Sequence, residues 1–256
     1  MSKHIDITIK DGILSIVMNR PEKKNALTLD MYTSMAHAMR GAENDPNVRV
    51  ILFTGAGGNF TSGNDLGDFM MNPPVGEDSP VWLFLSALLE AKKPLVAGVT
   101  GVAVGIGTTM LLHCDLAYAG ESARFLLPFI NLGLVPEAGS SFLLPRILGH
   151  PKAAELLMLG DVFGAGHAYE MGFINQVAAD DEVIALAQAK AAHLAAKPPA
   201  ALRLTKAMLK EGHADALAAT IRKESGLFIE RLSSPEAAEA LQAFMERRPP
   251  DFSKFS

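Results

Sequence analysis

The chain has 256 residues, of which 49% are hydrophobic and 20% are charged, so it can bury a substantial core and is not disordered. A formal net charge of −5 gives no general attraction to nucleic acid or anionic membranes, and a single cysteine excludes an intramolecular disulfide and a multi-thiolate metal site. Because the N-terminus carries no secretory signal and no uninterrupted apolar stretch reaches membrane-spanning length, we expect a cytoplasmic protein without nucleic-acid or membrane partners.

Alternating apolar residues at the start of the chain predict a β-hairpin over residues 5–18, with Asp11-Gly12 at its bend. Thr28 is placed to cap a helix that runs to about Asn44. The later elements of this part are a strand over 48–54, a glycine-rich loop over 55–63, a helix over 80–91, a strand over 95–99, a turn over 101–107 that bends into a helix, and a strand over 115–119.

Beyond Pro151 the sequence signals are almost all helical. Helices are expected near 151–159, 166–171, 181–196, 200–210, 214–232 and 235–246. Strands that alternate with helices in the first part favour repeated ββα or βαβ units. We therefore expect an α/β core over residues 1–195, followed by a helical C-terminal region over residues 196–256.

Several common catalytic and cofactor motifs are absent. The dinucleotide pattern G-x-G-x-x-G fails at Met110 when it is begun at Gly105, and the sequence contains neither a Walker A nor a G-x-S-x-G motif. The histidines have no metal-ligand spacing, so we expect no metal site. His113 follows an apolar helix and is interpreted as a core or helix-end residue.

Two glycine-rich segments depart from the pattern of a plain core. In residues 57–66, small residues allow backbone N–H groups to approach a ligand, although a surface turn with Asp65 as a helix cap explains the same residues. In residues 100–109, a strand runs into glycines that begin a helix, whose first N–H groups can stabilise a negative oxygen. Tight packing of helix on sheet is the alternative for this second segment.

A third segment, residues 131–141, contains Glu137 as a lone carboxylate in a largely apolar stretch. Apolar surroundings raise the pKa of a carboxyl group and make it a better base near neutral pH. A solvent-facing loop acid after Pro136 is the alternative.

Motifs in a fixed order extend over nearly the whole chain. They are Asn19-Arg20-Pro21-Glu22-Lys23-Lys24-Asn25-Ala26-Leu27, Phe60-Thr61-Ser62-Gly63-Asn64-Asp65-Leu66, Lys93-Pro94-Leu95-Val96-Ala97, Gly101-Val102-Ala103-Val104-Gly105-Ile106-Gly107, Cys114-Asp115-Leu116 and Glu246-Arg247-Arg248-Pro249-Pro250-Asp251-Phe252. Their order and spacing resemble the crotonase family, also called the enoyl-CoA hydratase/isomerase superfamily. The resemblance implies a spiral of ββα units followed by a helical C-terminal trimerisation region, assembled as a trimer or hexamer.

The resemblance also implies how an acyl-CoA thioester would bind. The thioester oxygen would accept hydrogen bonds from the backbone N–H groups of Asn64 and Ile106, which form an oxyanion hole beside Gly63, Gly105 and Gly107. Coenzyme A, as part of the substrate and not as a permanent cofactor, would contact Lys23, Lys24, Ala26, Ser62, Asp65 and Leu66. Arg247 and Arg248 are either phosphate contacts or part of a solvated tail.

The position of the acids separates the activities within this family. Hydratases use two glutamates, and the matching positions here are Thr109 and Phe129. Glu137 lies in a stretch similar to the N-L-G-x-x-P-E-G-x-S-S segment of Δ3,Δ2-enoyl-CoA isomerases of the peroxisomal type, with Ala138 in place of Gly. The resemblance therefore implies an isomerase in which Glu137 is the single acid–base group. An apolar wall would exclude water, formed by Phe129, Leu132, Leu134 and Phe142.

Two alternatives to the isomerase stay open. One is an enoyl-CoA hydratase or another crotonase-family acyl-CoA enzyme of fatty acid β-oxidation, and the other is a non-catalytic member that binds acyl-CoA or a protein. The apolar stripe of the helix over 80–91 also has two interpretations, core or wall of an acyl tunnel; it comprises Trp82, Phe84, Leu85 and Leu88.

Overall fold

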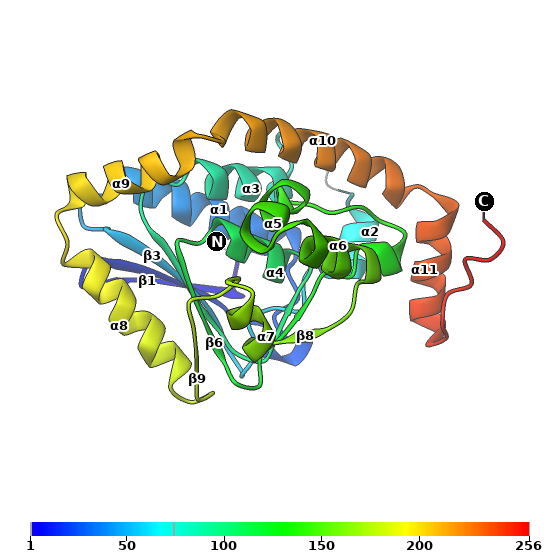
Figure 1. Ribbon diagram of the computed structural model, residues 1–256, viewed down its shortest axis with the longest axis horizontal. Coiled ribbons are helices and arrows are strands. Elements are labelled where there is room, and N and C mark those ends of the chain that lie inside the picture. The colour runs from blue at the N-terminus through cyan, green and yellow to red at the C-terminus, as the bar shows by residue number, and fades with distance from the viewer. Residues whose placement is uncertain (1, 74, 256) are drawn as a thin grey trace.

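The computed structural model describes residues 2–73 and 75–255 of the chain. A six-stranded sheet lies at its centre, in the order β1-β2-β3-β4-β6-β9 (Figure 1). The β1–β2 hairpin is antiparallel and every other pair in this sheet is parallel. The strands are β1 (Ile5–Lys10), β2 (Ile13–Met18), β3 (Val50–Gly55), β4 (Leu95–Val99), β6 (Leu116–Gly120) and β9 (Gln176–Ala178).

Helices cover both faces of this sheet. Strand β4 is buried along its whole length, as is typical of parallel strands with helices on either side. On one face lie α1 (Leu29–Asn44) and α3 (Pro80–Glu90), and on the other lies α8 (Val183–Ala195) (Figure 1). The expected end of the α/β core, residue 195, is the last residue of α8, whose buried alanines pack against the sheet.

The face that α1 presents follows directly from its sequence. Met31, Met35 and Met39 recur at helical spacing, and all three are fully buried against the sheet and α3. The Thr28 hydroxyl accepts a hydrogen bond from the Met31 N–H at 3.4 Å, so the predicted helix cap is confirmed.

A second, three-stranded sheet continues from the first. After β4 the chain passes Thr100 and Gly101 into β5 (Val102–Val104), which pairs in parallel with β7 (Arg124–Leu126). Strand β7 then pairs antiparallel with β8 (Phe163–Gly164). The glycine-rich turn at residues 101–107 therefore joins the two sheets, and the short helix α4 (Ile106–Thr109) follows it.

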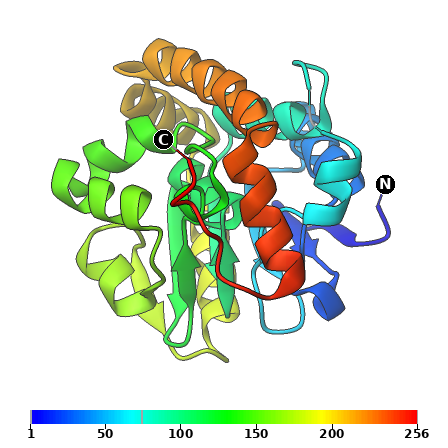
Figure 2. The same ribbon diagram turned by 90° about the vertical axis from the view of Figure 1, so that its right-hand side faces the viewer.

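The C-terminal helices arch over the helical face of the core. In Figure 1, α9 (Pro199–Glu211) and α10 (Ala214–Leu232) lie above α1, α3 and α5, and α11 (Pro235–Glu246) descends at one end. Figure 2 shows α11 with the C-terminal tail beside it. The helices predicted over 214–232 and 235–246 are confirmed to the residue.

An ion pair with a buried Lys206 side chain ties α9 to the end of the sheet at which β4 and β6 begin. The Lys206 ammonium lies 2.7 Å from the Asp115 carboxylate and donates to the Lys93 carbonyl oxygen at 2.7 Å. Asp115 in turn accepts from the Leu95 N–H at the start of β4. One network thus joins the C-terminal helices to the core.

Some short elements were not predicted from the sequence. The helix α5 (Ser140–Leu148) contains Pro145, which argues against a helix because proline lacks an N–H and clashes with the preceding turn. The short helix α2 (Leu66–Met71) and the 3₁₀ turns Pro21–Lys23, Met110–His113 and Ile130–Leu132 were not predicted either. By contrast, α6 (His150–Leu159) and α7 (Ala165–Glu170) match the helices predicted near 151–159 and 166–171. No helix in residues 2–73 and 75–255 is both long and apolar enough to cross a lipid bilayer.

Candidate active site

Two loops that follow neighbouring parallel strands are joined by backbone hydrogen bonds beyond the end of the sheet. The Phe60 N–H donates to the Thr100 oxygen at 2.7 Å and the Thr61 N–H to the Val102 oxygen at 3.0 Å. The Val104 N–H donates back to the Thr61 oxygen at 3.0 Å. These bonds hold the loop after β3 and the turn after β4 side by side. The two glycine-rich segments singled out in the sequence can therefore contribute to one site.

The first loop presents the Asn64 N–H as a free donor. The Leu27 N–H donates to the Gly63 oxygen and the Asp65 N–H to the Leu27 oxygen, both at 2.8 Å. These bonds lie on either side of Asn64, whose own N–H donates to no atom of the described residues. Gly63 has φ +87°, and a Cβ there would lie 2.8 Å from the Val104 oxygen, so only glycine fits this approach.

The second turn presents the Ile106 N–H. Ile106 is the first residue of α4, where N–H groups have no acceptor within the helix, and it too donates to nothing in the described part of the chain. A Cβ on Gly107 would meet the Thr61 methyl at 2.5 Å, so a glycine is required for α4 to lie this close to the first loop. The two loops therefore carry two unpaired amides on adjoining turns.

Glu137 is a buried carboxyl group without a hydrogen-bond partner. It is 6% exposed, and its Oε1 has no partner among the described residues. Burial, and to a lesser extent the negative charge of Glu224, together raise its pKa to about 8. Of the two interpretations of this residue, the structure excludes a solvent-facing loop acid and leaves a carboxyl group that is a good base near neutral pH.

The turn after Glu137 has an unusual backbone. Ala138 and Gly139 both have positive φ, +57° and +74°, which for alanine costs about 1–2 kcal/mol. The His113 Nε2 lies 2.7 Å from the Ala138 oxygen. Burial lowers the pKa of His113 to about 4, so the ring is neutral at pH 7 and donates its Nε2–H to this carbonyl. His113 is thus a core residue, as predicted, and it also holds the turn.

Tyr32 of α1 connects Glu137 to the first loop, a link that the sequence did not indicate. Its hydroxyl donates to the Asn64 side-chain oxygen. Burial raises the pKa of Tyr32 well above its ordinary value, and the negative charge of Glu137 raises it further. The Asn64 side chain and the charge of Glu137 therefore both act on the Tyr32 hydroxyl.

A pocket of about 190 Å³ opens at Glu137. Three aromatic rings line it, Phe69 of α2, Trp82 of α3 and Phe228 of α10, and the rim carries an ion pair between Glu77 and Arg222. The apolar stripe predicted on α3, interpreted either as core or as the wall of an acyl tunnel, contains residues of both kinds. Trp82 and Leu85 line the pocket, whereas Phe84 and Leu88 are fully buried in the core.

The residues expected to form an apolar wall lie elsewhere. Phe129 is 3% exposed and packs edge-on against Phe228 at 6.4 Å, behind the pocket surface. Leu132 and Leu134 are half-buried, and Phe142 is stacked under Arg146. None of these four lines the pocket at Glu137, whose walls come from α2, α3 and α10 instead.

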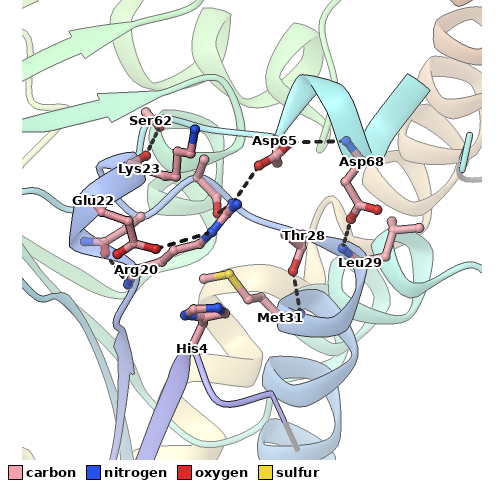
Figure 3. A network of polar contacts seen from close by, with 12 residues as sticks. His4, Arg20, Glu22, Lys23, Thr28, Leu29, Met31, Ser62, Asp65 and Asp68 are labelled. Carbon is pink, nitrogen blue, oxygen red and sulfur yellow. Dashed lines mark hydrogen bonds and ion pairs between the residues drawn. The ribbon is translucent and has the colours of Figure 1, made fainter. Parts of the chain in front are cut away.

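A second cluster lies where coenzyme A was expected (Figure 3). The Ser62 hydroxyl donates to the Lys23 oxygen at 3.1 Å and the Ser62 N–H to the Lys24 oxygen at 2.9 Å, which places both exposed lysines beside the first loop. Sequence reasoning missed the organising residue, Arg20. Its Nη1 donates to the Ala26 oxygen at 3.1 Å and to Asp65 at 2.6 Å.

Two of the side chains considered as contacts for coenzyme A, Asp65 and Arg248, already have partners. Asp65 accepts from the Asp68 N–H at 3.1 Å and caps α2, which begins at Leu66 (Figure 3), so its alternative interpretation as a helix cap is confirmed. Arg248 lies 2.6 Å from Glu239 and 2.6 Å from Glu246. Its guanidinium is therefore engaged within its own subunit.

No three His, Cys, Asp or Glu side chains gather where they could hold a metal ion, in the part of the chain that the structure describes. The site thus offers two free amides, one unpaired buried carboxyl group and an adjoining apolar pocket. Such a set can polarise a carbonyl group and move a proton on a neighbouring carbon.

Comparison with known proteins gives the same outline. The family model described as "Enoyl-CoA hydratase/isomerase" matches residues 8–254. Enoyl-CoA delta isomerase 2 of Rattus norvegicus is 35% identical over 97% of this chain, which spans 65% of that protein's length. The 1,2-epoxyphenylacetyl-CoA isomerase of Escherichia coli is 34% identical over 95% of this chain and 96% of its own length.

Solved structures share the whole fold. The structure of Pseudomonas aeruginosa OdaA is 48% identical and has a TM-score of 0.94, over 96% of this chain and 100% of that one. An enoyl-CoA hydratase/isomerase from Pseudoalteromonas atlantica is 38% identical with a TM-score of 0.93, over 98% of this chain and 100% of that one. The expected α/β fold with a helical C-terminal region is confirmed.

Proposed function

This chain belongs to the enoyl-CoA hydratase/isomerase family of the crotonase superfamily, and from that premise we propose that it shifts the double bond of a 3-enoyl-CoA to the 2-position. The observation that carries the proposal is Glu137, a buried carboxyl group that lines a largely apolar pocket and whose Oε1 has no partner among the described residues. A protein that only bound acyl-CoA would need no base there. Enoyl-CoA delta isomerases are among the relatives at 33–35% identity.

In this proposal the thioester oxygen lies between the Asn64 and Ile106 N–H groups, beside Gly63, Gly105 and Gly107. These donors are fixed before the substrate binds, so no reorganisation is needed when negative charge develops on the oxygen. Removing one such donor typically costs about 3–4 kcal/mol of transition-state stabilisation. The two free amides are the feature of the backbone that supports this assignment.

The proton transfer needs only one acid–base group. The Glu137 carboxylate removes a proton from C2, and the electron pair of that C–H bond moves into a dienolate on the thioester oxygen. The C3–C4 double bond becomes C2–C3 as the protonated Glu137 returns the same proton to C4. Atoms and charge balance with no metal or redox cofactor, and coenzyme A enters and leaves as part of the substrate.

The residues at the hydratase positions argue against hydration. Thr109 is fully buried with an unpartnered hydroxyl, and Phe129 is a buried hydrocarbon ring. Neither side chain can deprotonate a water molecule at neutral pH. Hydration by Glu137 alone is the second candidate, since relatives of similar identity include hydratases.

Binding of the nucleotide and pantetheine is proposed at the Arg20-centred cluster. Lys23 and Lys24 are exposed cations beside the loop that leads to Asn64, so they can meet phosphates, while Ala26, Ser62, Asp65 and Leu66 offer backbone and small polar contacts. Assembly as a trimer or paired trimers is proposed as well. Exposed apolar side chains on α6 and α9 support it, namely Met158, Leu159, Leu204, Met208 and Leu209.

The test is conversion of trans-3-hexenoyl-CoA to the conjugated 2-enoyl product, followed by ultraviolet absorbance, beside hydration of crotonyl-CoA. We expect isomerisation to dominate. Glu137→Gln should abolish isomerisation without loss of fold or coenzyme A affinity, because glutamine fills the same volume but cannot accept the C2 proton. Glu155→Gln is the matched control, since Glu155 is an exposed α6 residue paired only with Lys152.

Two results would contradict the proposal. Turnover by Glu137→Gln close to that of the wild type would remove Glu137 from the mechanism. Faster hydration of crotonyl-CoA than isomerisation of the 3-enoyl substrate would favour the second candidate.

A further inference from the structure

Glu224, on helix α10, is a second buried glutamate that points at the turn after Glu137. It is 5% exposed. Its carboxylate accepts from the Gly139 N–H at 2.6 Å, from the Ser141 N–H at 3.0 Å and from the Ser141 hydroxyl. A buried carboxylate that receives three hydrogen bonds from one short segment fixes the position of that segment.

We propose that Glu224 is a positioning residue for Glu137: its carboxylate holds the turn that follows Glu137, and its negative charge acts on the Glu137 carboxyl group. The inference rests on the proposed function, in which Glu137 is the base. It adds a role for α10, a helix from the C-terminal region that contributes no residue to the family motifs discussed above.

The positioning follows from the way α5 begins. The N-cap residue of α5 is Gly139, which has no side chain to accept the free N–H groups of the first turn. Glu224 supplies that acceptor from a distant helix. Because Ala138 and Gly139 are held at positive φ, the turn needs external hydrogen bonds to keep its shape. His113 supplies one to the Ala138 oxygen, and Glu224 accepts one from the Gly139 N–H.

The electrostatic effect follows from the groups that face Glu137. Tyr32 of α1 and the neutral His113 carry no charge at pH 7, and the Glu77–Arg222 pair at the pocket rim is exposed and largely neutralises itself. Burial of Glu137 is the main cause of its raised pKa, and the negative charge of Glu224 adds to it. A nearby negative charge favours the neutral form of a carboxyl group. Once Glu137 has lost its proton, the charge of Glu224 therefore makes the Glu137 carboxylate a stronger base.

The same helix also forms one wall of the pocket at Glu137. Ser225, Phe228 and Ile229 line it within two turns of Glu224. An acyl group in the pocket would therefore contact the helix that holds the base.

The experiment compares Glu224→Gln with Ser141→Ala. Both remove a hydrogen bond at the turn, but only the first removes the negative charge. In protein labelled with [¹³Cδ]glutamate, the Glu137 carboxyl signal is assigned by its loss in Glu137→Gln and followed from pH 5 to pH 10. We expect a midpoint near 8 in the wild type, a lower midpoint in Glu224→Gln, and the wild-type midpoint in Ser141→Ala.

The kinetic consequence is measured in parallel. In Glu224→Gln, kcat for isomerisation should fall by about 10²-fold, the effect of a small misplacement of a catalytic group, with a smaller change in KM. The acidic limb of the pH profile should move to lower pH. A role confined to stability would lower the amount of folded protein and leave this limb where it is.

An unchanged Glu137 midpoint in Glu224→Gln would overturn the proposal, as would an equal shift in Ser141→Ala. Should the glutamine variant not fold, Glu224→Asp keeps the negative charge on a shorter side chain. The Glu137 midpoint should then stay near the wild-type value while kcat falls. A lowered midpoint in Glu224→Asp would overturn the proposal. The titration needs no turnover, so an enzyme without isomerase activity would refute the proposed function separately.

Discussion

Replacing Glu137 by glutamine is expected to stabilise the protein at alkaline pH. Burial raises the pKa of Glu137 in the fold to about 8 from an ordinary value of 4.5, which is the value expected in the unfolded chain. Below pH 4.5 both states hold the proton, so the group does not affect stability. As the pH rises from 4.5 to 8, the unfolded chain ionises while the fold does not, so the free energy of unfolding falls.

The size of this effect follows from the width of the pH window. The window is about 3.5 pH units wide, and each unit corresponds to about 1.36 kcal/mol, so the wild type loses about 5 kcal/mol by pH 8. Glutamine does not titrate and fills nearly the same space. The stability of Glu137→Gln relative to the wild type should therefore grow with pH and level off above pH 8.

The measurement is urea unfolding of both proteins, followed by far-ultraviolet circular dichroism, at intervals from pH 5 to pH 9. All other titratable groups are common to the two proteins, so the difference in free energy of unfolding isolates residue 137. We expect that difference to increase by about 4–5 kcal/mol across this range. A constant difference would show that Glu137 titrates in the fold as it does in the unfolded chain, and would refute a neutral, buried carboxyl group.

Three further predictions follow from the same structure. In the wild type, kcat/KM for isomerisation should rise about tenfold per pH unit below the Glu137 pKa of about 8 and level off above it; a flat profile from pH 6 to pH 9 would contradict this. Ala138→Gly should stabilise the fold by up to about 1 kcal/mol and so raise Tm. Alanine at positive φ costs about 1–2 kcal/mol, which exceeds the entropic cost of glycine of about 0.5–1 kcal/mol. A lower Tm would argue against strain at this position. Lys206→Met should lower the free energy of unfolding in urea by about 3 kcal/mol by leaving Asp115 without its partner, whereas the double variant with Asp115→Asn should recover part of that loss.

The two glycine-rich loops of the candidate site were recognisable in the sequence, for a physical reason. The resemblance to the crotonase family selected Asn64 and Ile106 within these loops. The glycines beside them are required by close packing, because neither Gly63 nor Gly107 has room for a Cβ. Such constraints act between residues close in the chain or on neighbouring strands, so they leave a readable pattern. The alternation of strands and helices in the core is readable for the same reason.

The parts that were not predicted depend on contacts between distant segments. Tyr32 lies 32 residues from Asn64, and Glu224 lies 83 residues from Ser141; each looks like an ordinary residue of an amphipathic helix. The pocket wall was expected beside Glu137 in the sequence, but α10 and α3 supply it because they cross the site from elsewhere. The local sequence does not specify which distant helix will pack against a given loop.

The two free amides belong to the peptide backbone itself, and this affects how the protein can evolve. Among single substitutions, only proline deletes an N–H donor outright, so mutations that change the side chains at 64 and 106 leave both donors present. Under the proposed function, new chemistry can therefore arise when acids appear or disappear on the surrounding loops, as at positions 109 and 137, while both backbone donors are inherited intact.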